Sequence, residues 1–357
     1  MVVERQARPA WVDRVRSSDV DTRAVIVGID VGGTSDNVTV LAHDGTFLID
    51  RLLEVPSRVL DGPAGALAAL RQAYELALST TGRSHDEVLA VGLDTPGPAG
   101  ATGILSKKGS TNFSGPEWWG YDIRGALEHE LGRPVVYSND GNAAAMYAHY
   151  AHFGAVAIDR SSVSAIVGTG LGGGVIHDGR IVVGAAGMGG ELGHVHIPAA
   201  GIVEADQPVP VCACGFVSDA ESYASLTGIK NHLLPYWLSK YPDHPLHGVD
   251  PSAAAKQVRG LAERDHDPMS LAIFEQQAKA LGHLFTVAAN FTDPDAFFVG
   301  GGVVETDPWF RTWFLDTVRA HTTLRAEQAE RTEFALVQDL DMAGARGAAL
   351  AALRSVG

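Results

Sequence analysis

Two cysteines lie one residue apart in the segment "VCACGFVSDAES", as Cys212 and Cys214. A thiol pair at this spacing could ligate a metal, form a redox couple or simply pack. The redox interpretation is the weakest, because C-x-C lacks the helix-start C-x-x-C context that lowers a thiol pKa. Two cysteines among 357 residues give no disulfide framework, so a reducing cytoplasm is the simplest location.

Two glycine-rich turns could bind phosphate, because glycines let backbone N–H groups crowd around an anion and a Thr hydroxyl adds a donor. The first, in "GIDVGGTSDNVTV", comprises Asp30, Gly32, Gly33 and Thr34. The second, in "GTGLGGGVIHDGR", formally matches the dinucleotide fingerprint G-x-G-x-x-G. That fingerprint requires a following helix, and "VIHDGRIVV" has the pattern of a hairpin. A second phosphate-binding hairpin at Thr169 and Gly170 is therefore favoured.

Three further segments contain polar residues or glycines, and each segment could serve either a functional or a purely structural role. Asp140, after Asn139 at a predicted strand end, could cap a helix or act as a general base in a cleft. "GGELGHVHIP" offers Glu191, His194 and His196, either for binding hydroxyl groups or as ordinary loop residues. "FFVGGGVVE", with the glycines at 300–302, could cover a nucleobase or ribose or form a plain turn.

The elements that carry these residues fall into two similar halves. The first opens with strand patterns at Ala24–Ile29, Asn37–Ala42 and Thr46–Val55, with "HDG" as a hairpin turn between the last two. The second half repeats the order strand, glycine turn, strand. We therefore predict an α/β protein with two lobes and a cleft between them. Its parts are a tail over 1–22, a smaller lobe over 23–138, a larger lobe over 139–344, and a helix over about 345–357 that packs back on the smaller lobe.

Composition excludes several classes of protein. The formal net charge of −15 argues against binding to nucleic acid or to a membrane surface, since both need basic patches. No apolar run approaches the roughly 20 residues that span a bilayer, and the N-terminal segment lacks the apolar core of a secretory signal.

Eight motifs together resemble one family in their order along the chain. They are "DVGGT", "PGP", "STNFSGPEW", "SNDGNAAA", "GTGLGGG", "GELGH", "CACGFVSDAES" and "VGGG". From about Ala24 to its end the chain resembles the ROK family of sugar kinases and sugar-sensing repressors, within the actin-like ATPase superfamily. The resemblance implies a two-lobed, ribonuclease H-like fold with a central interdomain cleft. It also implies glucokinase-like transfer of a phosphoryl group from ATP to a hexose hydroxyl, typically the primary one.

The resemblance implies a role for each matching residue. Asp140 would be the general base that accepts the proton of the attacking hydroxyl. The sugar would be bound by Asn112, Asn139, Asp140, Glu191, His194 and Glu221. The ATP phosphates, bridged by Mg²⁺, would be bound by Asp30, Gly32, Gly33, Thr34, Thr169 and Gly170. The remaining expected nucleotide-binding residues are Gly300, Gly301 and Gly302.

The cysteine segment departs from the family pattern, which places a zinc ion on a His and three cysteines. Here His194, Cys212 and Cys214 match, and Asp219 stands where the third cysteine is expected. A carboxylate can ligate Zn²⁺, so Asp219, or alternatively His196 or water, would complete the site. The other alternative is a loop that packs around two reduced thiols without metal. Because this loop orients the sugar ligands in the family, its change leaves the substrate open.

We expect an ATP-dependent carbohydrate kinase that forms a homodimer, with glucose as the default substrate. The scaffold would equally suit another sugar, an amino sugar or a cyclitol of secondary metabolism, and ATP or polyphosphate as donor. A non-catalytic sugar-binding regulator is the alternative from another class. The family's repressors carry a helix-turn-helix of many tens of residues before the first strand, whereas about 22 residues precede it here, which favours the kinase.

Overall fold

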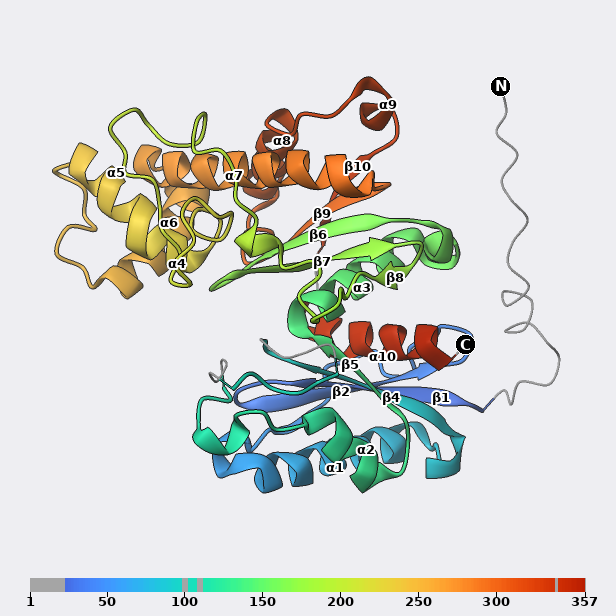
Figure 1. Ribbon diagram of the computed structural model, residues 1–357. Coiled ribbons are helices and arrows are strands. Elements are labelled where there is room, and N and C mark those ends of the chain that lie inside the picture. Colours follow the sequence, from blue (N-terminus) through green and yellow to red (C-terminus); the bar gives the residue numbers. More distant parts are fainter. Residues whose placement is uncertain (1–22, 98–101, 108–111, 338–339, 357) are drawn as a thin grey trace, which may run out of the picture. The chain divides into compact units, whose positions relative to one another are not determined.

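Runs of buried Val and Ile form the first strands of the chain. The computed structural model describes residues 23–97, 102–107, 112–337 and 340–356. The predicted tail over 1–22 lies outside the described residues. The chain divides into two units (Figure 1). Unit 1 runs up to Asn139 and resumes at Gly344, and unit 2 is Asp140–Ala343. Each unit contains one five-stranded sheet with helices, so the predicted α/β class is confirmed.

The sheet of unit 1 has the strand order β3-β2-β1-β4-β5. Its strands are β1 (Val25–Val31), β2 (Ser35–Ala42), β3 (Glu54–Pro56), β4 (Val88–Thr95) and β5 (Val135–Asn139). The first three strands are antiparallel, and β4 and β5 run parallel to β1. The predicted strand over Thr46–Val55 is not continuous, because the exposed Asp50 and Arg51 interrupt its apolar run. Its start pairs with β2 only through a bridge between Phe47 and Leu41, and its end joins the sheet as β3.

Helices cover both faces of this sheet (Figure 1). They are α1 (Gly62–Thr81) and α2 (Ile123–Leu131) on one face and α10 (Ala343–Val356) on the other. Two glycines explain how closely α10 approaches the strands. A Cβ atom added at Gly28 would lie 2.0 Å from the Ala345 carbonyl oxygen, and one added at Gly92 would lie 2.0 Å from that of Ala348. The C-terminal helix therefore packs directly on the backbone of β1 and β4.

The sheet of unit 2 has the order β10-β9-β6-β7-β8 and repeats the topology of the first. Its strands are β6 (Ser162–Val167), β7 (Leu171–His177), β8 (Arg180–Ile181), β9 (Ala296–Gly301) and β10 (Glu333–Val337). Here too a central strand has antiparallel partners on one side and parallel partners on the other. The two halves of the sequence with similar strand and turn patterns thus fold into sheets with the same strand order and directions.

Unit 2 has the larger share of helices. They are α3 (Asp140–Phe153), α4 (Leu226–Gly228), α5 (Leu234–Lys240), α6 (Pro251–Asp265), α7 (Pro268–Thr292), α8 (Pro308–Ala320) and α9 (Ala326–Ala329). Helix α3 packs on one face of the sheet, near Phe298, while α7 covers the other face, where Phe285 stacks on Phe297 (Figure 1). Among the described residues, no helix has the length and apolar character needed to cross a membrane.

Candidate active site and metal centre

The first glycine turn lies between β1 and β2 and brings two predicted site residues together. The Gly32 N–H donates to the Ser35 carbonyl at 3.0 Å, which closes the turn. A Cβ atom at Gly33 would lie 2.7 Å from Asn112 Oδ1, so only glycine leaves room for this side chain. Asn112 itself adopts a left-handed backbone with φ of 69°. In unit 1 a predicted sugar ligand thus lies directly against the predicted phosphate-binding turn.

Asp30, at the end of β1, is buried beside a second carboxyl. Burial raises the pKa of Asp30, while hydrogen bonds from the side chains of Asp94 and Asn37 oppose that rise. The register pairs Asp30 with Asp94 across parallel strands. Mg²⁺ prefers carboxylate oxygens, water and phosphate oxygens as ligands, so the donor set at this strand end fits a magnesium ion that accompanies a nucleotide.

Asp36 is a buried carboxyl for which the sequence offered no clear signal. It pairs in register with Val31 and Val55, both members of the apolar cluster under α1. Its carboxylate oxygens have no hydrogen bond of regular geometry among the described residues, and the nearby Gly32 N–H opposes the rise of its pKa only in part. Burial, reinforced by the negative charge of Asp30, raises the pKa of Asp36 to about 8. Near neutral pH this side chain therefore carries a proton.

Asp140 begins helix α3 directly after β5 ends at Asn139, as the sequence predicted. The Asp140 side chain is exposed, and its Oδ1 accepts from the Gly141 N–H at 2.8 Å. This short-range bond stabilises the helix start. Both predicted roles, helix cap and general base, are compatible with this geometry.

Glycines at the start of α3 and within β7 let the helix approach the sheet. A Cβ atom at Gly141 would lie 2.7 Å from the Gly173 nitrogen. Gly172, Gly173 and Gly174 belong to β7 rather than to the phosphate-binding loop. The absence of a helix after these glycines confirms that the dinucleotide fingerprint does not apply.

The second glycine turn, between β6 and β7, is held by the segment that follows the cysteines. The Gly168 N–H donates to Gly170 O at 2.9 Å within the turn, and the Thr227 hydroxyl donates to Thr169 O at 2.8 Å. Glu221 Oε2 accepts from the Leu171 N–H at 2.9 Å. A predicted sugar ligand and a predicted phosphate turn are thus adjacent in unit 2 as well.

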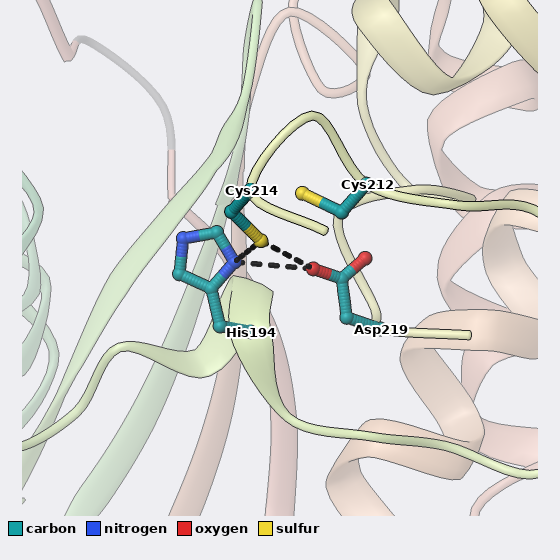
Figure 2. Close-up of side chains that lie close together, drawn as sticks. All are labelled: His194, Cys212, Cys214 and Asp219. Atoms are coloured by element: carbon teal, nitrogen blue, oxygen red, sulfur yellow. Dashed lines mark hydrogen bonds and ion pairs between the residues drawn. The ribbon is translucent and has the colours of Figure 1, made fainter. Parts of the chain in front are cut away.

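Four side chains of the cysteine region converge on one point (Figure 2). They are His194, Cys212, Cys214 and Asp219, and one potential ligand atom from each lies within 4.8 Å of the others. His194 Nδ1 lies 3.1 Å from Asp219 Oδ2, and Cys214 Sγ lies 3.7 Å from that nitrogen and 3.9 Å from that oxygen. Ligands about 2.0–2.3 Å from a tetrahedral zinc lie roughly 3.3–3.8 Å apart. The group therefore fits zinc in donor type, and His194, Cys214 and Asp219 have nearly this spacing, while the whole group extends to 4.8 Å.

Backbone pairing gives the cysteine loop its shape. The Cys212 N–H donates to Phe216 O at 2.8 Å, and His196 bridges to Asp219 across an isolated antiparallel pair. Ser218 has φ of 58°, a left-handed backbone typical of glycine, and its hydroxyl donates to Ile197 O at 2.8 Å. His196 itself turns away, with Nδ1 against Val217 O at 2.9 Å. Asp219 rather than His196 therefore faces the two thiols.

Of the three predicted glycines at 300–302, only Gly302 lines a pocket of about 280 Å³ in unit 2, whereas Gly300 and Gly301 end strand β9 and lie outside its lining. The Gly302 N–H donates to Val167 O at 2.9 Å, which holds the glycine segment beside β6. Thr169 of the second glycine turn lines the same pocket. The two glycine segments that were predicted to bind a nucleotide therefore meet at one cavity, whose walls include Leu226, Ile229, Phe274 and Val303. Glu191 lies apart from this cavity, at the start of a 3₁₀ turn that contains His194.

Comparison with known proteins identifies relatives over nearly the whole chain. The sequence model of the ROK family matches residues 26–355. A glucokinase of Halalkalibacterium halodurans is 30% identical over 284 residues, which cover 78% of this chain and 80% of that protein. The crystal structure of a ROK hexokinase from Thermus thermophilus superposes with a TM-score of 0.73 at 28% identity, covering 93% of this chain and 99% of that one. A Streptomyces griseus ROK glucokinase, solved in complex with glucose and AMPPNP, superposes with a TM-score of 0.64 at 26% identity over 91% of this chain and 98% of its own.

Proposed function

Because this chain belongs to the ROK family and has the actin-like ATPase fold of its relatives, we infer that it is an ATP-dependent carbohydrate kinase. The observation that carries this inference is the combination of two glycine turns with an acidic residue at the start of α3, in a chain that matches the family throughout. For the identity of the sugar substrate, we propose a hexose, with glucose as the first candidate.

In the proposed mechanism, Asp140 accepts the proton of the sugar hydroxyl as the hydroxyl oxygen attacks the terminal phosphorus of ATP. The bond from this phosphorus to the bridging oxygen breaks, and ADP leaves. The transferred group carries charge on its equatorial oxygens, so catalysis consists of positioning and of charge stabilisation rather than covalent chemistry. The backbone N–H groups of the turns at Gly32–Thr34 and Thr169–Gly170 would bind the phosphate oxygens. Mg²⁺, held near Asp30, would neutralise the negative charge of the phosphates when bound.

The sugar would be held by paired polar groups. Asn112 and Asn139 would contribute amide groups from unit 1, and Glu191, His194 and Glu221 would contribute from unit 2. Hydroxyl recognition by such groups gives strong selectivity, since a substrate without the matching hydroxyl leaves buried polar atoms unpaired. We propose that Zn²⁺, bound by His194, Cys212, Cys214 and Asp219, fixes the loop that presents Glu221 two residues after Asp219. Homodimer formation and a cytoplasmic location remain predictions.

A coupled assay of ADP release over a panel of hexoses, amino sugars and cyclitols tests the kinase function. We expect turnover with one class of substrate and a fall in kcat of about 100-fold or more in Asp140→Asn, while sugar binding persists. Asp178→Asn is the matched control, because Asp178 lies in an exposed turn with φ of 47°, which Asn tolerates. ADP release from none of the panel, or full activity of Asp140→Asn, would contradict the proposal.

A further inference from the structure

The pocket beside Gly302 has one cationic wall that the nucleotide motifs of the sequence do not include. Helix α6 places Lys256 and Arg259 at this pocket, three residues apart and therefore on one face of the helix. Lys256 is exposed and Arg259 is half-buried. In a chain with a net charge of −15, two cations at one cavity mark a place for a ligand with oxygen acceptors or negative charge.

Arg259 also fixes the shape of the pocket. Its Nη1 donates to the Gly302 carbonyl oxygen at 2.7 Å, while the Gly302 N–H donates to Val167. Gly302 is thus held from both sides, by α6 and by β6. A guanidinium has five N–H donors in a planar fork, so the bond to Gly302 leaves further donors for a ligand.

Apart from Thr169 and the buried amide of Gln277, the rest of the pocket is mainly apolar. Leu226, Ile229, Phe274 and Val303 form its walls. Such walls suit the flat face of a base, and Thr169 at the glycine turn marks the side on which phosphates would lie. Between the base and the phosphates, a nucleotide presents ribose hydroxyls, which accept hydrogen bonds, and its first phosphate, one of the anions that a guanidinium binds best.

We propose that Arg259 sets the affinity of this kinase for the nucleoside part of its phosphoryl donor. It does so by holding the Gly302 wall and by donating to the ribose or the adjacent phosphate, with Lys256 adding charge at the rim. This inference rests on the proposed kinase function. Inorganic polyphosphate has neither base nor ribose and cannot fill the nucleoside part of the pocket, so Arg259 should matter less for polyphosphate than for a nucleotide donor.

Isothermal titration with a non-hydrolysable ATP analogue tests this role without requiring turnover. We expect Arg259→Gln to weaken binding about tenfold or more, as for the loss of a charge-assisted hydrogen bond, and Arg259→Lys to recover part of that loss. Lys256→Gln should cost about threefold or less because this side chain is exposed. Arg264→Gln is the matched control, since it removes one positive charge from the same helix at an exposed position outside the pocket.

Steady-state kinetics separate a nucleotide role from general damage. In Arg259→Gln the KM for ATP should rise about tenfold, while the KM for the sugar changes less than about twofold. Equal affinity of wild type and Arg259→Gln for the analogue would overturn the inference and leave the kinase function standing. Absence of nucleotide binding by the wild type would overturn both. An equal loss with polyphosphate as donor would also overturn the role in nucleoside recognition. If Arg259→Gln does not fold, Arg259→Lys tests the inference instead. It should bind the ATP analogue at least about threefold more weakly than wild type, because the planar guanidinium fork is lost.

Discussion

Asp36 allows a quantitative prediction, because it is a fully buried carboxyl on the apolar face of unit 1. Its pKa rises from 3.8 to about 8 on folding. Below about pH 4 the side chain is largely neutral in both the folded and the unfolded state, so it adds no pH dependence to the free energy of unfolding. Between about pH 4 and pH 8 the unfolded chain releases the proton and the folded chain keeps it, so the free energy of unfolding falls as pH rises.

The size of the fall in the free energy of unfolding follows from the difference between the folded and unfolded pKa of Asp36. Each unit of pKa difference corresponds to 1.36 kcal/mol, so at pH 7 the penalty reaches about 4 kcal/mol as an upper limit. Asp36→Asn keeps the volume of the side chain but cannot ionise. We therefore expect the variant to lose up to about 1.4 kcal/mol of pH dependence per pH unit between pH 5 and pH 7.5, and to be more stable than wild type at the upper end.

Urea denaturation of wild type and Asp36→Asn across this pH range, with a chelator present to remove Mg²⁺, measures the difference. Hydrogen exchange of the β1 and β2 amides assigns it to unit 1. Asp44→Asn is the control, because Asp44 is exposed and its pKa is lowered by the Thr46 N–H, so it titrates below the range. Parallel pH profiles for wild type and Asp36→Asn would refute the reasoning.

Three further changes have defined outcomes. Gly92→Ala should lower the free energy of unfolding by about 1–3 kcal/mol or more in thermal denaturation, because the new Cβ meets α10, whereas Gly97→Ala, with open space around its Cβ position, should have no effect. Metal analysis after dialysis should find no zinc in Asp219→Ala and one equivalent in Asp219→Cys. A wild-type protein that binds no zinc would count against the site. Glu221→Gln should raise the KM for the sugar about tenfold, since the Leu171 N–H keeps an acceptor but the sugar loses a charged one; a change confined to the KM for ATP would contradict this role.

The order and type of the main elements could be predicted because apolar strands alternate with periodic helices and glycine turns. Motif order likewise led to the four side chains of the metal cluster. Three of them, Cys212, Cys214 and Asp219, are close in sequence, and His194 comes from an earlier motif. What the sequence did not reveal depends on tertiary packing. The burial of Asp36 results from α1 closing over its strand, and nothing in "TSDNV" distinguishes it from its neighbours. Arg259 on α6 reaches Gly302, just after β9, through a tertiary hydrogen bond across 43 residues of sequence.

The return of the chain to unit 1 has a consequence for the order of folding during synthesis. Unit 2 is one continuous segment, whereas unit 1 needs both the residues up to Asn139 and those from Gly344 onward. On the ribosome, β1 and β4 are synthesised long before α10. Gly28 and Gly92, on which this helix packs, therefore stay exposed until unit 2 has been synthesised. Unit 2 can therefore reach its native state first, against the usual order in which the N-terminal part folds before the rest.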